Sequence, residues 1–330
     1  MSRSIIEIQS FPRIHMTLLD MNGGFGNVNG GIGFAINFPS NRIRIQGARK
    51  NMINWPTSSA RDVQHFIGET ANRVAKLKRL GRYEIDIRQS VPSHHGFGSF
   101  TSSSLSVVEG LLLHNSVPYT REEIVSLSHR GGTSGVGVNT YFEGKMTIDL
   151  GHCVSENLRA SNFTPSSSSW KRGPAMKLAT VKVPAWPILL VLPKARTLSE
   201  EEEISFFRRT CPIPRHEVAK TIHLCVFGIL PAVMTGDYAR FCRMVRELKN
   251  TFWKKSEIRL YREQVIDIIR RAEEIGADAA SMSSLGPLVY CLIKRRRINF
   301  VRRRLEKEFD LAFTGLTFPR NEGRGIVVSK

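Results

Sequence analysis

Three segments of the chain combine glycine with hydroxyl and cationic side chains, a composition typical of loops that bind phosphate. The first, residues 94–104 (HHGFGSFTSSS), lies between an apolar strand pattern and an apolar helix pattern. Glycine lets the backbone approach a ligand closely, and the unpaired N–H groups at a helix N-terminus attract negative charge. The segment therefore suits a di- or triphosphate, although it would also suit a capped turn. Its candidate ligands are Gly96, Gly98, Ser99 and Thr101.

Two further segments have the same character. Residues 129–137 (HRGGTSGVG) again join glycines, hydroxyls and a cation, and residues 281–287 (SMSSLGP) precede an apolar strand pattern. Each alone is compatible with an ordinary loop, but together in one basic chain they predict a phosphate site. The candidates here are Arg130, Thr133, Ser134, Gly135 and Ser284.

The elements that must position these segments follow from hydrophobic periodicity. Apolar residues alternate with polar ones in three places, which predicts half-buried strands at residues 6–8, 43–45 and 83–87. An amphipathic helix is expected over residues 63–77, with Ser58 and Ser59 as its N-cap and Gly81 as its stop. A second helix over residues 99–114 follows the first glycine-rich segment, so its N-terminus is expected to face the ligand.

The rest of the chain continues this mixture of strands and helices. Residues 120–123 have the form of a capping box that opens a third helix. Tyr141 and Phe142 are expected to pair with residues 146–150 in a hairpin that turns at Gly144. The remaining predictions are a polar loop at 161–174, a buried strand at 188–192, helices at 214–233, 237–249 and 256–275, and strands near 288–293 and 325–328. Strands segregated from helices, without an internal repeat, indicate an α+β fold in two layers.

The composition excludes several classes of protein. A chain of 330 residues with 41% hydrophobic side chains can bury a full core, which excludes a disordered protein. Five cysteines without a CxxC pair suggest neither a disulfide framework nor a zinc site and fit a reducing cytoplasm. No apolar run approaches the roughly 20 residues of a membrane span, and the first residues lack the pattern of a signal peptide. A cytoplasmic protein without a membrane partner is expected.

The formal net charge of +19 predicts anionic partners. Its densest part, residues 294–307, is expected to form a helix beginning near Ile298, with Phe300, Val301 and Leu305 facing the core and the arginines in solvent. No aromatic interleaving or recognised nucleic-acid motif accompanies these arginines, so a solvated helix face is favoured over a nucleic-acid contact.

Taken together, residues 92–99, 132–136 and 283–290 resemble the three motifs of the GHMP kinase superfamily. The chain is more closely similar to one branch, the β-ribofuranosylaminobenzene 5′-phosphate synthase family, at residues 11–20 (FPRIHMTLLD), 30–33 (GGIG), 130–137 (RGGTSGVG), 149–152 (DLGH) and 201–212 (EEEISFFRRTCP). The resemblance implies an α+β, GHMP-kinase-like fold of two two-layer lobes. Residues 1–160 would form a lobe like ribosomal protein S5 with the phosphate-binding loop, and residues 161–330 a ferredoxin-like lobe.

The resemblance also implies an activity. Enzymes of that family use phosphoribosyl pyrophosphate and Mg²⁺, and a ring carbon of 4-aminobenzoate attacks the anomeric carbon while pyrophosphate and carbon dioxide leave. The product is a C-riboside 5′-phosphate of methanopterin biosynthesis. Relatives of the family make C-nucleoside antibiotics from carboxylated pyrazoles, which are the alternative acceptors, and a homodimer is expected.

One position separates a transferase from a kinase. In GHMP kinases that resemble this chain, the middle motif ends in an aspartate that orients or deprotonates the acceptor hydroxyl. Here the corresponding residue is Gly137, which cannot act as a base, whereas the phosphate-binding segments suit pyrophosphate equally well. A small-molecule kinase and a basic binding protein without catalysis are the alternatives.

Roles for individual side chains follow from the same resemblance. The glycine-rich segments would hold the pyrophosphate, and Arg13 or Arg130 would hold the carboxylate of the acceptor, for which a guanidinium fork is well shaped. His15 and Asp20 are expected to point into the pocket, although His15 could be a satisfied core histidine. Asp20 is the candidate Mg²⁺ ligand, or else it stabilises the turn at residues 22–24. The acidic run 201–203 could bind a metal or form a solvated helix N-terminus.

Overall fold

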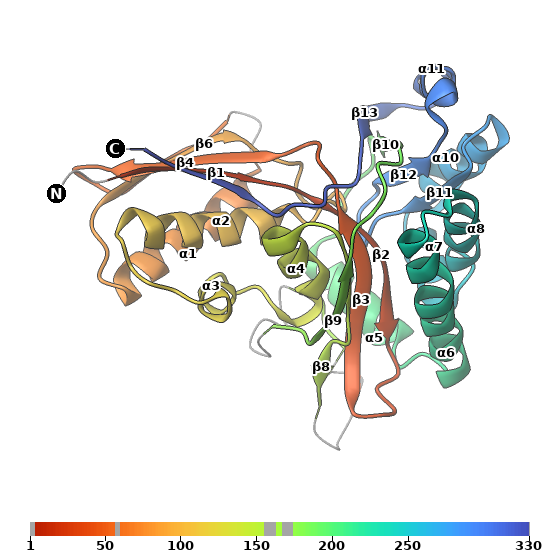
Figure 1. Cartoon of the computed structure of the whole chain (residues 1–330), viewed down its shortest axis with the longest axis horizontal. Helices are drawn as coiled ribbons and strands as arrows, with labels where there is room; N and C mark the ends of the chain where they lie inside the picture. The colour runs from red at the N-terminus through yellow and green to blue at the C-terminus, as the bar shows by residue number, and fades with distance from the viewer. Residues whose placement is uncertain (1–3, 57–59, 155–162, 167–173, 330) are drawn as a thin grey trace.

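Strands from both ends of the chain meet in the sheet that supports the first glycine-rich segment. The computed structural model describes residues 4–56, 60–154, 163–166 and 174–329, and within them the strands form three sheets (Figure 1). The first sheet has the order β14–β1–β4–β6–β5. Its strands are β1 (Ile5–Ser10), β4 (Asn41–Gly47), β5 (Met52–Asn54), β6 (Tyr83–Gln89) and β14 (Gly325–Ser329).

Helices cover one face of this sheet. In β1 and β6 every second residue is buried, because the apolar side chains of a period-two strand all point to the covered face. The covering helices include α2 (Ser99–His114), and Gly110 lets that helix approach β4 so closely that a Cβ there would lie 2.4 Å from the Ile45 side chain. The other helices of this lobe are α1 (Arg61–Leu77), α3 (Arg121–Leu127) and α4 (Gly135–Glu143).

The second sheet lies next to the glycine-rich segments and carries the segment 11–20. Its order is β2–β3–β7–β9, with β8 pairing to β3. Residues 14–19 of β2 and 28–35 of β3 are all buried, so this sheet is covered on both faces. Its strands are β2 (Arg13–Asp20), β3 (Asn27–Ala35), β7 (Met146–Asp149), β8 (His152–Cys153) and β9 (Lys177–Val181).

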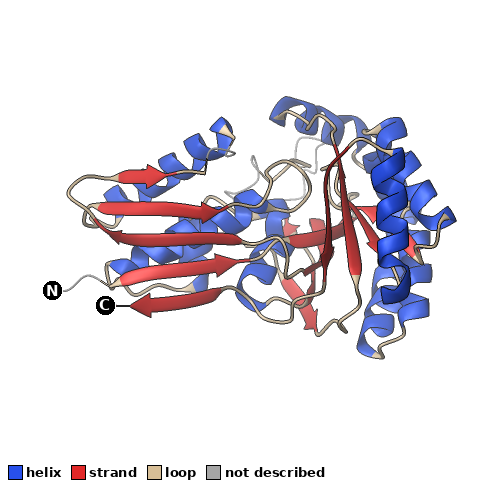
Figure 2. Cartoon of the chain, turned by 90° about the horizontal axis from the view of Figure 1, so that it is seen from above, coloured by secondary structure: helices blue, strands red, loops and turns tan. Residues whose placement is uncertain are grey.

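The third sheet has the order β11–β12–β10–β13 and lies among the helices of the C-terminal half (Figure 2). Leu190 on one face packs in the same cluster as Phe241, and Val191 on the other face packs with Val265 and Val301. The strands are β10 (Ile188–Pro193), β11 (Ala279–Met282), β12 (Val289–Leu292) and β13 (Leu311–Thr317). The helices are α5 (Glu200–Thr210), α6 (Arg215–His223), the π-helix at Leu224–Ile229, α7 (Leu230–Met234), α8 (Tyr238–Leu248), α9 (Phe252–Arg259), α10 (Arg262–Glu274) and α11 (Ile298–Glu308).

Most of the predicted elements are confirmed, but the expected hairpin is wrong. Tyr141 and Phe142 belong to the last turn of α4, and Gly144, at φ +64°, ends that helix before β7 begins. The Tyr141 hydroxyl donates a hydrogen bond of 2.6 Å to Glu109 on α2, so this turn packs on a helix. The predicted helix at 256–275 is likewise two helices, α9 and α10, which are separated at Leu260 and Tyr261.

The predicted lobes share strands, although the division at residue 160 stays a prediction. β14 pairs with β1 and β9 pairs with β7, so two strands of the second half complete sheets of the first half. Of the predicted loop at 161–174, residues 161–162 and 167–173 lie outside the described residues, as do the predicted caps Ser58 and Ser59. The observed N-cap residue of α1 is Ala60.

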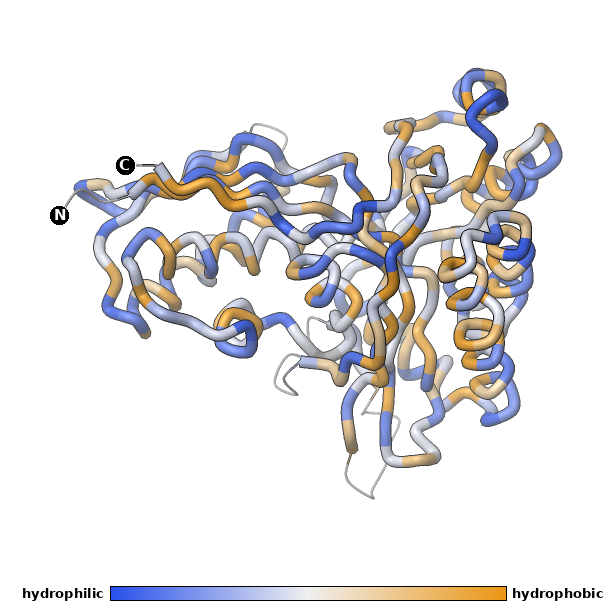
Figure 3. Tube along the Cα trace, viewed as in Figure 1, coloured by the Kyte–Doolittle hydropathy of each residue, from blue (hydrophilic) through white to orange (hydrophobic). Residues whose placement is uncertain are grey.

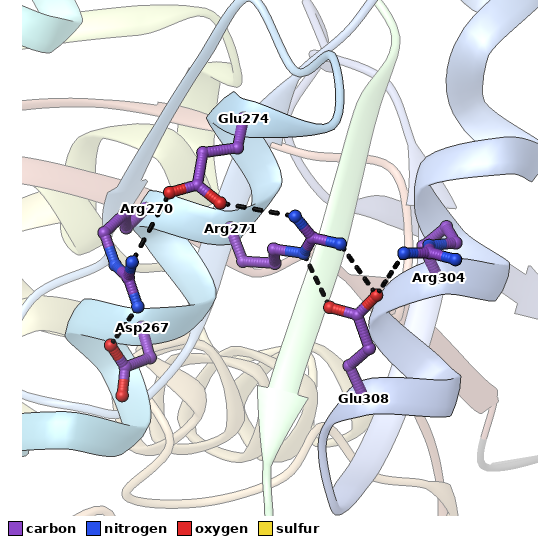
Figure 4. Close-up of polar contacts among 6 residues, drawn as sticks. All are labelled: Asp267, Arg270, Arg271, Glu274, Arg304 and Glu308. Atoms are coloured by element: carbon purple, nitrogen blue, oxygen red, sulfur yellow. Dashed lines mark hydrogen bonds and ion pairs between the residues drawn. The ribbon is translucent and has the colours of Figure 1, made fainter.

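The basic segment forms the predicted solvated helix face. Val301 and Leu305 of α11 are buried, but Phe300 is 58% exposed, which corrects its assignment to the core. Figure 3 shows α11 as largely hydrophilic. Its Arg304 contacts Glu308 at 2.9 Å, and Glu308 also accepts two hydrogen bonds from Arg271 of α10 at 2.6 and 3.0 Å. This network joins α10 to α11 (Figure 4).

One helical stretch, Arg215–Met234, is long and apolar enough to cross a bilayer by length and composition. Within it Cys225, Ile229 and Ala232 are fully buried in the cluster that also contains Phe34 and Leu190. A helix that contributes to such a cluster behaves as a core helix of a globular protein, so the stretch gives little support for a membrane span.

Candidate active site

A cavity of about 780 Å³ lies where the glycine-rich segments of the N-terminal half meet α5 and α9. The N-terminal half contributes backbone and hydroxyl groups from the first two predicted phosphate segments, and the C-terminal half contributes the third segment, carboxylates and further aromatic rings. The lining includes Arg13, His15, Asp62, Phe66, His94, Gly96, Gly98, Ser99, Phe100, Thr101, His129, Arg130, Thr133, Ser134, Gly137, Ser166, Leu198, Glu200, Glu203, Phe207, Trp253, Glu257 and Ser284.

The glycine-rich loop presents the N-terminus of α2 to this cavity. Gly98 is the N-cap residue at φ +75°, and no side chain caps the first turn. Three other described helices do have side-chain caps, from Thr120 on α3, Ser199 on α5 and Asp237 on α8. Gly96 lies at φ +96°, and a Cβ there would lie 2.4 Å from the backbone oxygen of Ser283, so only glycine fits without displacing the loop. The uncapped N-terminus can therefore bind an anion.

Arg13, at the start of β2, packs directly against this loop. Its Nη1 donates a hydrogen bond of 2.5 Å to the Gly96 carbonyl, and a Cβ on Gly98 would lie 3.0 Å from its Cζ. Its Nε is buried and has no hydrogen-bond partner. Burial and the neighbouring Arg130 lower the pKa of Arg13 to about 10, so the guanidinium stays charged at neutral pH. A partner-less donor on a charged group favours an anionic ligand.

Arg130 is a second buried guanidinium, and its partners are neutral. Its Nε donates to the Thr101 hydroxyl at 3.1 Å, and its Nη2 donates to the Ser134 and Ser166 hydroxyls at 2.9 and 2.7 Å. No carboxylate of the described residues lies within ion-pair distance. Burial lowers its pKa to about 10. The charge of Arg130 is thus held in place by hydroxyls but is not neutralised.

His15 is a neutral residue of the cavity wall. Burial, followed by the charges of Arg13 and Lys254, lowers the pKa of its imidazole well below the usual value, so it carries no charge at neutral pH. Its Nδ1 is buried without a hydrogen-bond partner. Its backbone N–H donates to the Ser283 hydroxyl at 3.1 Å, and its carbonyl accepts from the Ser284 N–H at 3.0 Å. These contacts join β2 to the third segment.

Three carboxylates of the C-terminal half line the cavity, those of Glu200, Glu203 and Glu257, and the last two differ in their electrostatic surroundings. Glu257 on α9 forms an ion pair with Lys254, and both side chains are almost fully buried. Glu203 on α5 has no ion pair or hydrogen bond to its carboxylate from the described residues. Burial raises the pKa of Glu203 to about 7, against the opposing attraction of His94 and Arg130.

All but two of the predicted site residues line this cavity. Asp20 lies outside the lining and accepts hydrogen bonds of 2.8 Å from the N–H groups of Asn22 and Gly23, which is the turn role that the sequence left open. Gly135 is also outside the lining and packs against Asp149, one of whose oxygens would lie 2.5 Å from a Cβ at this position. Gly137 does line the cavity, and a Cβ added at this glycine would lie 3.2 Å from Thr101.

Several residues of the cavity were not predicted. Glu203 was weighed only as part of an acidic run, and Glu257 and Trp253 were not singled out. The aromatic rings of Phe66 and Phe100 also line the cavity without having been predicted to do so. The only sequence signal for Glu203 is its place three residues after Glu200, which puts both carboxylates on one face of α5.

Comparison with known proteins identifies the fold superfamily and the family. The model for the GHMP kinases N terminal domain matches residues 65–143, and the model for the GHMP kinases C terminal matches residues 229–311. β-Ribofuranosylphenol 5′-phosphate synthase of Methanothermobacter thermautotrophicus is 32% identical over 293 residues, covering 86% of this chain and 87% of the relative. The chain belongs to this synthase family. The Methanocaldococcus jannaschii synthase, 32% identical over 304 residues, covers 88% and 90%. The family expected from the motifs is confirmed, and its members are enzymes.

Solved structures confirm the α+β GHMP-kinase-like fold of the synthase family. Homoserine kinase from Cytophaga hutchinsonii superposes with a TM-score of 0.66 at 14% identity, covering 99% of this chain and 98% of that one. Mevalonate kinase of L. major, solved with R-mevalonate, gives 0.67 at 12% identity and covers 96% of each chain. Mevalonate pyrophosphate decarboxylase of Streptococcus pyogenes gives 0.66 at 10% identity, with coverage of 97% and 98%. At these identities the likeness concerns the fold.

Proposed function

We propose that this enzyme joins the ribose 5-phosphate of phosphoribosyl pyrophosphate to a ring carbon of a carboxylated aromatic acid, with release of pyrophosphate and carbon dioxide. The observation that carries the proposal is the pair Arg13 and Arg130, two charged guanidiniums beside an uncapped helix N-terminus that have no carboxylate partner within ion-pair distance among the described residues. Such a site favours anionic ligands. Both substrates are anionic.

The diphosphate of the donor lies at the N-terminus of α2. Gly96 and Gly98 bring the backbone close, Ser99 and Thr101 supply hydroxyls, and Arg13 supplies positive charge through its free Nε. Thr133, Ser134 and Ser284 complete the wall on either side. These groups bind the charge that develops on the leaving pyrophosphate, which lowers the barrier to breaking the bond at the anomeric carbon.

The reaction then needs no nucleophile from the protein. A ring carbon attacks the anomeric carbon as the C–O bond to pyrophosphate breaks, and its electron pair leaves with the pyrophosphate. The carboxylate on the same ring carbon departs as carbon dioxide, and the electron pair of the broken C–C bond restores the aromatic ring. Neutral His15 adds no charge beside the developing cationic ribosyl centre, which a protonated histidine would destabilise.

Mg²⁺ is proposed to enter as a complex with the diphosphate. Within the described residues no three His, Cys, Asp or Glu side chains gather as a metal site, and Asp20 serves a turn outside the cavity. A protein-built Mg²⁺ site therefore does not fit the described residues. Mg²⁺ commonly keeps its waters and binds through substrate phosphates, so the expectation of a Mg²⁺ requirement rests on the donor.

The acceptor is proposed to be a para-substituted benzoate such as 4-aminobenzoate. The relatives are named for a ribofuranosylphenol, which favours testing 4-hydroxybenzoate beside 4-aminobenzoate. A pyrazole carboxylate is the alternative, because it offers the same carboxylate and a ring N–H. A cytoplasmic homodimer is proposed from the family resemblance.

The test is incubation of the purified chain with phosphoribosyl pyrophosphate, Mg²⁺ and each ring acid. We expect equal amounts of pyrophosphate, carbon dioxide and a C-riboside 5′-phosphate, measured by enzyme-coupled pyrophosphate detection, trapped ¹⁴C from a carboxyl-labelled acid, and mass spectrometry. Phosphorylation of a small alcohol by ATP without pyrophosphate release would instead establish the kinase alternative. Retained binding of both substrates without any product would indicate a binding protein.

A further inference from the structure

Arg130 and Glu203 are opposite charges that line the same cavity and attract each other without forming an ion pair. The charge of Arg130 acts to lower the pKa of Glu203. The charged atoms of the two residues are nevertheless farther apart than the 4.0 Å of an ion pair. Arg130 is fixed by hydroxyls of Thr101, Ser134 and Ser166 and cannot move toward Glu203 without losing those bonds. Both residues line the same cavity, so one ligand bound there can contact both charges.

The other charged groups nearby have different roles. Arg13 is committed to the glycine-rich loop, since it bonds to Gly96 and packs under Gly98. Glu257 is paired with Lys254, and His94 with Asp62 at the rim. Arg13 also has no carboxylate within ion-pair distance in the described part of the chain, but its contacts hold it beside the glycine-rich loop, which leaves Arg130 and Glu203 as the remaining pair of opposite charges.

We propose that the ring acid lies between Arg130 and Glu203, with its carboxylate on the guanidinium and its amino or hydroxyl group donating to the Glu203 carboxylate. The proposal rests on the proposed function and decides between Arg13 and Arg130 as the carboxylate anchor. A molecule with an anion at one end and a hydrogen-bond donor at the other satisfies both residues.

The walls between the two charges suit a flat ring. Phe66, Phe100, Phe207 and Trp253 line the cavity, and the rings of Phe207 and Trp253 pack 5.2 Å apart between centroids. Aromatic side chains bind a ring by stacking or edge contacts without requiring polar groups on its faces. The polar ends of the acceptor would then determine its orientation, while the apolar walls would determine its shape.

Glu203 would also take part in the chemistry. As the ring carbon bonds to the anomeric carbon, positive charge develops on the para nitrogen or oxygen, and the N–H or O–H proton passes to the Glu203 carboxylate. When carbon dioxide leaves and its bonding electron pair restores the ring, the proton returns to the same nitrogen or oxygen. Glu203 is unchanged over the cycle, and no oxidant, reductant or further base is needed.

This role requires Glu203 to be ionised, which gives the proposal a pH signature. The titratable and charged groups that act on Glu203 are His94 and Arg130 across the cavity, Glu200 one turn back on α5, and Tyr261 beyond α9. Because burial raises the pKa of Glu203 to about 7, acceptor binding should weaken as the pH falls through about 7. The step is expected to disappear when Glu203 is replaced by glutamine.

The experiment is a binding cycle between variants and ligands in the full-length protein, measured by calorimetry at pH 8 with pyrophosphate and Mg²⁺ present. The ligands are 4-aminobenzoate and benzoate, which lacks the donor group. The variants are Glu203→Gln, Arg130→Met and, as the matched control, Glu201→Gln, which removes a charge from the same helix turn at an exposed residue outside the cavity. Neutralising Glu203 should not impair folding, because burial disfavours its charged form.

We expect Glu203→Gln to weaken 4-aminobenzoate about tenfold and benzoate less than twofold, because a charge-assisted hydrogen bond becomes a neutral one. Arg130→Met should weaken both ligands, and Glu201→Gln neither. In turnover, Glu203→Gln should lower kcat about a hundredfold and abolish the pH step near 7. Equal weakening of both ligands by Glu203→Gln, or of neither, would overturn the proposal, as would the absence of any binding by the parent protein.

The outcomes also separate this proposal from the proposed function. If the parent protein forms the C-riboside but Glu203→Gln binds 4-aminobenzoate as tightly as the parent does, only the placement of the acceptor is refuted. The predicted binding pattern without pyrophosphate release from phosphoribosyl pyrophosphate would support the placement and refute the reaction.

Discussion

Introducing a carboxylate at position 137 is expected to weaken binding of the acceptor, because the new side chain can pair with Arg130. Gly137 lies in the first turn of α4, has no left-handed backbone angle, and lines the cavity. A Cβ there would lie 3.2 Å from Thr101 Cγ2 and 3.6 Å from its Oγ1, and that hydroxyl accepts from Arg130 Nε at 3.1 Å. The carboxylate of Gly137→Asp can therefore reach the Arg130 guanidinium with only a small shift of Thr101.

The magnitude follows from what the new carboxylate replaces. Hydrogen bonds between charged groups are worth about 1.5–3 kcal/mol, so an internal partner for Arg130 should weaken the carboxylated acceptor about 10- to 150-fold. Folding should not suffer. The helix propensities of aspartate and glycine differ by only about a few tenths of a kcal/mol, and the gain of about 0.3–1 kcal/mol from an aspartate in the first turn offsets the close Thr101 contact.

The assay compares acceptor and donor affinities of the parent protein, Gly137→Asp and Gly137→Asn by calorimetry. Asparagine has nearly the same volume as aspartate but no charge, so it isolates the electrostatic effect. We expect the loss of acceptor affinity with aspartate to exceed that with asparagine at least tenfold, with donor affinity changed much less. Equal losses for the two variants would show a steric effect, and a larger loss of donor affinity would place the donor on Arg130.

Three further outcomes are expected. Replacing Ser99 and Thr101 together by alanine should weaken phosphoribosyl pyrophosphate about tenfold in calorimetry, since two hydroxyl contacts of about 0.5–1.5 kcal/mol each are lost; unchanged binding would remove this loop from the donor site. Glu257→Gln should lower the free energy of unfolding by about 3–5 kcal/mol in urea, because it leaves the buried Lys254 ammonium without an anionic partner, and adding Lys254→Met should restore most of it. A Glu257→Gln variant as stable as the parent would contradict the buried pair. Finally, Mg²⁺ should bind measurably only once pyrophosphate is present, and tight binding to the free enzyme would reveal a protein-built metal site.

The backbone groups of the site were predictable because their signals are local. The glycine pattern at 94–98 and the apolar helix after it determine an uncapped helix N-terminus, which the structure shows at Gly98. The capping box predicted at Thr120 is likewise local, and its hydroxyl accepts from the Glu123 N–H. The predicted hairpin at Gly144 was wrong because a glycine that ends a helix cannot be told from a glycine in a turn when the preceding helix begins with two glycines in three residues.

The side chains that complete the cavity were not predictable, because their role depends on which surfaces meet. Glu202 and Glu203 are neighbours in one acidic run. Glu202 completes a capping box with Ser199 and stays near solvent, as the sequence suggested for the run. Glu203 is turned by about 100° around the helix and faces a cavity whose other wall lies in the N-terminal half. Periodicity predicts the helix but not the surface opposite it.

The same cavity explains how a kinase-like fold could serve ribosyl transfer. Both reactions need a diphosphate held by backbone N–H groups, and the loop at the N-terminus of α2 provides this in either case. A kinase also needs a base beside the acceptor hydroxyl. Attack by a ring carbon instead needs a group that binds the acceptor carboxylate and a second group that accepts a proton from the para nitrogen or oxygen. Glycine at position 137 leaves Arg130 without a carboxylate partner, and α5 supplies Glu203 at a distance. On this reasoning the loss of one carboxylate and the gain of another, from a different lobe, change the acceptor from an alcohol to a ring acid.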